Sequence, residues 1–173
     1  MNFLHSPRVW MALFLGLGLF ASAYLLVVYV TGGPILCGSS GCETVRSSSW
    51  AFVGPLPRPA LGVVFYTSML LILVGRAISP WKERTLRLLT MIGAFLGLLE
   101  SIHLFFIQWL WVHAFCAWCL TSGFATLVVA ACELFDRSSL TEEQRLRDLK
   151  GYTFVYILLI LVGAPALWLL LHS

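Results

Sequence analysis

The sequence predicts an all-α integral membrane protein, built as a four-helix transmembrane bundle with a fifth, peripheral transmembrane helix. Two observations favour this fold class. Hydrophobic residues make up 60% of the 173 residues and charged residues only 11%, whereas roughly 25% of the residues in a soluble domain are charged. Five apolar stretches are also long enough to cross a hydrocarbon core as helices, which takes about 20 residues. Helices are expected because lipid offers the backbone no hydrogen-bond partner, so every N–H and C=O must be paired within the protein.

The predicted spans cover residues 9–30, 60–75, 86–111, 114–134 and 152–171 of a single membrane domain, 1–173. The first span follows a short N-terminus that carries Arg8, so a signal peptide is the alternative. The apolar region of a signal peptide has about 7–15 residues, whereas this apolar run continues to Val30. We therefore interpret it as a membrane span.

The distribution of basic residues predicts the orientation, because short loops rich in Lys and Arg stay on the cytoplasmic side. Arg46 and Arg58 fall in the outer loop, residues 31–59, which carries a predicted short interfacial helix. The N-terminus is therefore predicted to be cytoplasmic, and the loop and the C-terminus outside. The net charge of +3 reflects this topology and gives no sign of a nucleic-acid partner. The other nine basic residues are Arg8, Arg76, Lys82, Arg84, Arg87, Arg137, Arg145, Arg147 and Lys150.

Four of the five cysteines are predicted on the outer side, where disulfides form and persist. Cys37 and Cys42 lie in the outer loop, and Cys116 and Cys119 begin the fourth span. Cys132, near the cytoplasmic end, is predicted to be an ordinary buried thiol.

The C-x-x-C pair is the strongest chemical signal in the chain. Cys116 and Cys119 share a helix face and occupy its first turn, where the helix dipole lowers the pKa of a thiol. A reactive dithiol facing a membrane suits an electron carrier that is dissolved in the membrane. Two alternatives are small core residues and a zinc site made by all four thiolates, which would need the two pairs to converge tetrahedrally. No compact soluble finger surrounds the pairs, so we expect no metal.

The outer loop contains the second pair. Gly38 to Gly41 predict a flexible link that lets the sulfurs of Cys37 and Cys42 meet or part. Residues 43–53 predict the short interfacial helix, with Trp50 in the aromatic belt. The next segment is expected to be extended, because it contains Pro55, Pro57 and Pro59.

Three stretches together resemble the vitamin K epoxide reductase family: CETVRSSSW at 42–50, GVVFYT at 62–67 and CAWC at 116–119. The resemblance runs from about Cys37 to Cys119 and includes the helix order. It implies a bundle around a quinone of the ubiquinone or menaquinone type, with the fifth helix outside as in bacterial members. An inner (cell) membrane of a bacterium is the implied location, with the active cysteines on the periplasmic or extracellular side.

The resemblance also implies roles for individual residues. Cys37 and Cys42 would take electrons from a separate thioredoxin-like (DsbA-like) protein. Which of these two cysteines meets that protein first stays open. Cys116 would exchange with this pair, and Cys119 would face the quinone. Residues implied at the quinone site are Ser48, Phe65, Tyr66 and Cys119.

Glu100 and His103 lie at i and i+3 of the third span and so share a face. An ionisable residue inside the membrane suggests function. Because quinone reduction consumes two protons, the pair could relay them; alternatively, the two side chains only satisfy each other and lock helix packing.

The sequence is less typical of three other functions. Arg58 stands where animal enzymes have a quinone-contacting asparagine, and Gly123 where they have a tyrosine. Because both residues differ, disulfide-linked quinone reduction is favoured over vitamin K epoxide reduction. A DsbB-type thiol oxidase has similar chemistry, but there the C-x-x-C pair comes first in the chain. A non-catalytic membrane subunit would use the cysteines only as structural disulfides.

Overall fold

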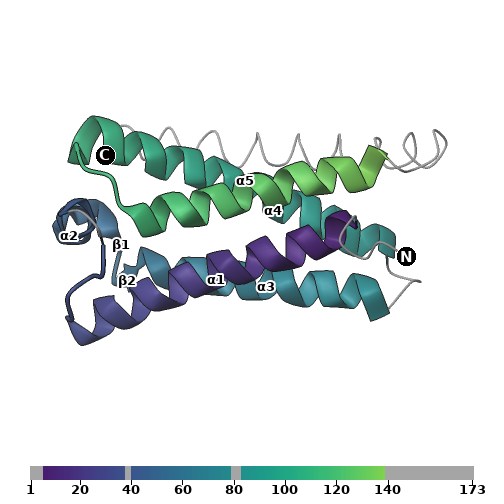
Figure 1. Cartoon of the computed structure of the whole chain (residues 1–173), viewed down its shortest axis with the longest axis horizontal. Helices are drawn as coiled ribbons and strands as arrows, with labels where there is room; N and C mark the ends of the chain where they lie inside the picture. The colour runs from purple at the N-terminus through teal and green to yellow at the C-terminus, as the bar shows by residue number, and fades with distance from the viewer. Residues whose placement is uncertain (1–5, 38–39, 79–82, 139–173) are drawn as a thin grey trace. The chain divides into compact units, whose positions relative to one another are not determined.

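The computed structural model describes residues 6–37, 40–78 and 83–138 (Figure 1). Within this part of the chain, four helices are long and apolar enough to cross a membrane. The protein is thus an all-α integral membrane protein, as the composition predicted. The predicted fifth span, residues 152–171, lies outside the described residues. The four helices are α1 (Pro7–Thr31), α3 (Arg58–Ile78), α4 (Glu83–Ile107), continued by the π-helical turn η4 (Gln108–Val112), and α5 (Ala117–Ser138).

The observed helices differ from the predicted spans mainly at their ends, because polar end residues are helical without being apolar. Proline at the first position starts α1, where its missing N–H costs nothing. Gly32 ends the helix in the left-handed conformation, φ 68°, and its N–H bonds the Val28 carbonyl at 3.0 Å. The last of the described helices, α5, begins at Ala117 rather than at residue 114, because the chain first turns at His113, φ 51°.

All four long helices contribute to one core within the compact unit that ends at Phe135. A Cβ on Gly18 of α1 would lie 2.3 Å from the ring of Tyr66 on α3, so these helices approach closely only because residue 18 is glycine. Cys132, predicted to be buried, is partly exposed and packs against this core. The buried core residues are Met11, Leu15, Tyr66, Met69, Leu73, Ala94 and Val129.

Charged residues tie the helices together at a second place. Arg76 of α3 donates to Glu133 of α5 at 2.8 Å and to the Thr90 hydroxyl of α4 at 3.2 Å. All three residues are buried. A buried ion pair is tolerated when it is hydrogen-bonded in this way, and removing one partner would leave a charge inside the bundle.

The first loop, residues 32–57, joins α1 to α3 and differs from the prediction. Its short helix, α2, spans Gly41–Ser47 and not 43–53. The helix ends because Ser48 is extended, φ −74° and ψ 151°, and donates its hydroxyl to the Val45 carbonyl at 2.6 Å. A 3-10 turn, η2 (Ser49–Ala51), follows.

A two-stranded hairpin completes the first loop. Strand β1 (Phe52–Val53) pairs antiparallel with β2 (Leu56–Pro57), and Gly54 turns the chain with φ 60°. Helix α3 then starts at Arg58, so the extended approach predicted for three prolines is wrong at Pro59. This residue lies in the first helical turn, where proline is tolerated.

Candidate functional site

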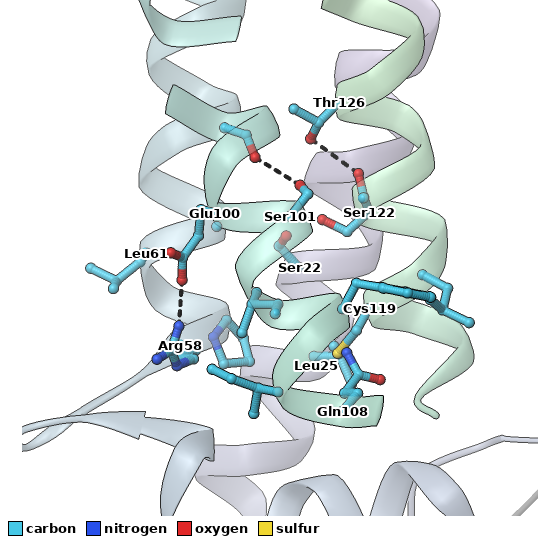
Figure 2. Close-up of a pocket in the computed structure, with 18 of the residues that line it drawn as sticks. Ser22, Leu25, Arg58, Leu61, Glu100, Ser101, Gln108, Cys119, Ser122 and Thr126 are labelled. Carbon is cyan, nitrogen blue, oxygen red and sulfur yellow. Dashed lines mark hydrogen bonds and ion pairs between the residues drawn. The ribbon is translucent and has the colours of Figure 1, made fainter. Parts of the chain in front are cut away.

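A cavity of about 650 Å³ lies between the four long helices and the first loop, and Figure 2 shows part of its lining. This volume is within the range of about 300–1,000 Å³ for small-molecule sites. The lining is mostly apolar and aromatic, with a few polar groups, which is typical of a site for an apolar ligand with a polar end. The polar members include Ser22, Ser48, Arg58, Tyr66, Glu100, Ser101, Gln108, Ser122 and Thr126.

The C-x-x-C pair stands where α5 begins. Cys116 immediately precedes the helix, and its carbonyl accepts the N–H of Leu120 at 3.0 Å. Cys119 lies one turn further along and lines the cavity. Cys116 is 2% exposed and is not among the described lining residues. One cysteine of the pair therefore lies at the cavity, and the other lies beneath the part of the protein that covers Cys116.

Gln108 fixes the position of Cys116. Its side-chain oxygen accepts the Cys116 N–H at 2.8 Å, and the side chain is buried and lines the cavity. Its backbone carbonyl accepts the N–H of Ala114 at 3.2 Å, which closes the turn around His113. π-Helical turns such as this one are frequent at functional sites. Gln108 thus sets where α5 starts.

The first loop brings the other cysteine pair to this end of α5. Cys37 and Cys42 form a disulfide. Cys42 is 1% exposed, whereas Cys37 is partly exposed. A Cβ on Gly41 would lie 2.3 Å from the carbonyl oxygen of Phe115. The residue before Cys42 therefore packs directly on the residue before Cys116.

The environment of Cys116 favours its thiolate. The pKa of Cys116 is lowered to about 7, chiefly because the Cys119 side chain donates a hydrogen bond to its sulfur. Burial opposes this shift, and the backbone N–H groups of Cys119 and Trp118 add to it. An ordinary cysteine has a pKa of about 8.5. Near neutral pH, Cys116 is therefore both a competent nucleophile and a good leaving group in thiol exchange.

We expect the alkylation rate of Cys116 to fall as the pH is lowered through about 7, because only the thiolate reacts. Iodoacetamide labelling with site-resolved mass spectrometry would measure the midpoint in protein carrying Cys37→Ser and Cys42→Ser. Cys119→Ala removes the chief stabilising hydrogen bond, so the midpoint should rise toward about 8.5. A midpoint of about 8.5 with Cys119 intact would contradict this environment for Cys116.

Arg58, Glu100 and His103 form a chain of ionisable groups, of which the first two line the cavity. Arg58 Nη1 donates to Glu100 Oε1, as the dashed line in Figure 2 shows. The other carboxylate oxygen of Glu100 lies 3.2 Å from His103 Nδ1. Within the described part of the chain, the buried Nε of Arg58 has no hydrogen-bond partner. The guanidinium of Arg58 therefore contributes a partly buried charge at the edge of the cavity, held by Glu100.

Hydroxyl groups from all four long helices line the same cavity, and Figure 2 labels Ser22, Ser101, Ser122 and Thr126 among them. The Tyr66 hydroxyl donates to the Ser122 carbonyl at 2.7 Å and lies 2.8 Å from the hydroxyls of Ser122 and Thr126. Ser22 of α1 and Ser101 of α4 add two more. These hydroxyls add polar groups to a cavity whose lining is otherwise mostly apolar.

The structure brings most of the predicted site residues together. Of the nine, five line the cavity, and His103 contacts one of these through its ring nitrogen. The loop cysteines and Cys116 lie outside the described lining. The five lining residues are Ser48, Phe65, Tyr66, Glu100 and Cys119.

Sequence reasoning missed Gln108 and the contact between Arg58 and Glu100. A lone amide in the apolar run FFIQWLW is a signal that could have identified Gln108. The Arg58–Glu100 contact joins residues 42 apart in the chain, and no local pattern reports it.

A protein-family model matches most of the chain. Residues 9–134 match the model of the Vitamin K epoxide reductase family, which covers more than half of the chain, the four long helices and both cysteine pairs. No curated protein matches the chain at a significant level. Members of the matched family are membrane oxidoreductases. The resemblance seen in the cysteine motifs is therefore confirmed, and the chain belongs to the vitamin K epoxide reductase family.

Proposed function

We propose that the protein is a quinone-dependent thiol oxidoreductase that supports disulfide bond formation. A separate thioredoxin-like (DsbA-like) protein donates two electrons to the Cys37–Cys42 pair. The electrons pass to Cys116 and Cys119 and then to a quinone of the ubiquinone or menaquinone type. The observation that carries this proposal is the position of Cys119 in the lining of an apolar cavity of about 650 Å³ while Cys116 lies under the first loop.

The residues of the cavity fit a quinone. Aromatic and aliphatic side chains suit an apolar ring and tail, and the guanidinium of Arg58 adds a charged polar group to the lining. Ser48 and Gln108 supply further polar groups beside Cys119 in the lining. A quinone accepts two electrons and two protons, which is the chemistry that thiol oxidation in a membrane requires.

Burial supports one order of thiol exchange. Cys37 is the more exposed member of its pair and meets the partner protein, whereas Cys42 packs into the protein and exchanges with Cys116. Each exchange passes through a mixed disulfide. Attack of the Cys42 thiolate on a Cys116–Cys119 disulfide releases the Cys119 thiolate at the cavity. Cys37 then attacks Cys42, which restores the loop disulfide and leaves Cys116 reduced.

Glu100 and His103 supply the proton path in this proposal. Glu100 is both a lining residue and half exposed, so it joins the cavity to its surroundings. Arg58 holds one of its oxygens and His103 contacts the other. A proton that reaches His103 can therefore pass to the carboxylate and on toward the site.

Purified protein tests the proposed function directly. Reduced thioredoxin-like donor should be oxidised while added quinone is consumed in equal amount, since each step moves two electrons. Donor oxidation without quinone consumption would reject the quinone role. Absence of donor oxidation by the unaltered protein, with loss of folding in the cysteine variants, would indicate a non-catalytic subunit with structural disulfides. Reduction of added vitamin K epoxide would favour the epoxide reductase alternative.

For location, we propose a bacterial inner (cell) membrane with the N-terminus in the cytoplasm. The nine-to-two split of basic residues supports this orientation. Reporter fusions at Ser40 and after His172 should then read as external, and a fusion after Ile78 as cytoplasmic. A cytoplasmic signal at Ser40 would reverse the whole arrangement.

Ser48→Ala should weaken the use of quinone only in part. The structure has the Ser48 hydroxyl bonded to Val45, so it must turn to bind a ligand, and a neutral hydrogen bond contributes about 0.5–1.5 kcal/mol. The KM for quinone should rise by roughly two- to tenfold, with exchange between the cysteine pairs unchanged. Ser47→Ala, at an exposed neighbour, is the control. Unchanged kinetics over a range of quinone concentrations would assign Ser48 to ending α2 alone.

A further inference from the structure

The backbone of Leu36, directly before Cys37, is hydrogen-bonded through both its N–H and its carbonyl. Its N–H donates to the Tyr24 hydroxyl at 2.8 Å, and its carbonyl accepts the indole N–H of Trp118 at 2.9 Å. The Leu36 side chain itself is 76% exposed. Packing of this side chain therefore does not fix the segment, and the two hydrogen bonds do.

The two residues that hold Leu36 also contact each other. The ring centroids of Tyr24 and Trp118 lie 4.6 Å apart, and the Phe20 ring lies 6.2 Å from that of Trp118. Tyr24 belongs to α1, whereas Trp118 lies between the two cysteines of the C-x-x-C on α5. One small cluster thus joins the C-x-x-C motif of α5 to Leu36, the residue before Cys37.

We propose that Tyr24, Leu36 and Trp118 form a clamp that positions the Cys37–Cys42 pair against Cys116. Tyr24 and Trp118 are positioning residues, because neither is among the described residues of the cavity lining. The clamp rests on the proposed function, since its purpose is exchange between the two pairs. Electrons pass from the loop to the C-x-x-C in the clamped state, and opening the clamp frees the segment around Cys37 for the partner protein.

The strength of the clamp suits reversible closure. Both hydrogen bonds join neutral groups at exposed positions, and each such bond changes an equilibrium by roughly two- to tenfold. The loop is therefore held in place but can leave. A second attachment, from Arg46 Nη1 to the Gly33 carbonyl at 2.7 Å, lies at the other end of the segment and can act as its hinge.

Hydrogen exchange in full-length protein tests the clamp without any turnover. Tyr24→Phe and Trp118→Phe keep an aromatic ring and each remove one hydrogen bond. The peptide that covers residues 32–37 should exchange roughly two- to tenfold faster in either variant, and faster again in the double variant. The matched control is Trp109→Phe, at a residue 54% exposed and outside the described cavity lining.

Turnover supplies the second readout. With a thioredoxin-like donor, kcat should fall by roughly two- to tenfold in the clamp variants, because less of the loop is docked. Turnover driven by dithiothreitol should not fall in Tyr24→Phe, because a small reductant does not depend on docking of the loop. Equal loss with both reductants would show a general structural role and overturn the clamp.

Unchanged exchange of residues 32–37 in the double variant would also overturn the clamp, whatever happens to turnover. Failure of the unaltered protein to reduce quinone would count against the proposed function. The exchange measurement remains valid in that case, so the two failures are distinguishable.

Discussion

Replacing Cys119 with serine is expected to abolish quinone-dependent turnover and to accumulate a mixed disulfide between Cys116 and Cys42. Among the described residues, Cys119 is the cysteine that lines the cavity, so its loss separates the thiol relay from the quinone. Cys116 can still attack the loop disulfide, and the buried Cys42 is the member that packs toward it. Without a second thiol on α5, no onward step removes the mixed disulfide.

Alkylation of free thiols followed by mass mapping would identify the trapped pair. Cys132→Ser is the matched control, because Cys132 packs against the bundle core and is not among the described residues around the cavity. That variant should keep full turnover. Retention of quinone-dependent donor oxidation in Cys119→Ser would show that the proposed order is wrong, and a trapped Cys116–Cys37 pair would exchange the roles of the loop cysteines.

Replacing Gly41 with alanine is expected to give the second large effect. A Cβ at this position would lie 2.3 Å from the carbonyl oxygen of Phe115, and a backbone atom cannot move aside as a side chain can. Overpacking of this kind costs about 1–3 kcal/mol. Docking of α2 on the start of α5 should therefore weaken by roughly tenfold or more, and donor-driven kcat should fall with it.

Gly33→Ala is the matched control in the same loop, since its added Cβ would meet only the Thr31 hydroxyl at 3.5 Å, an ordinary contact. Dithiothreitol-driven turnover should be unaffected in both variants. Donor-driven turnover of Gly41→Ala equal to that of Gly33→Ala would mean that exchange between the pairs does not require this packing.

Only part of the Arg58–Glu100–His103 chain could be predicted from local sequence patterns. The spacing of Glu100 and His103 correctly predicted that they share a helix face, and the two side chains do contact each other. Arg58 enters from a different helix. Its contact with Glu100 depends on how α3 and α4 are rotated about their axes, which hydropathy does not report.

The same distinction holds for the first loop. Its glycines and prolines predicted breaks in the chain, and a short helix was expected near Cys42. The end of that helix is set by the hydroxyl of Ser48, and the following hairpin by pairing of Phe52 with Pro57. Such contacts compete with helix formation over a few residues, so composition alone placed the helix too far along the chain.

By itself, the sequence determined the membrane-spanning helices, the two cysteine pairs and the family, because hydropathy and short motifs are local properties of the chain. The tertiary structure alone decided that Cys42 is the buried member of its pair and that the Gln108 side chain accepts the Cys116 N–H. It also decided that Tyr24 and Trp118 hold Leu36. These relations depend on close packing between segments far apart in sequence, where a difference of one atom, such as the Cβ that Gly41 lacks, determines which surfaces can meet.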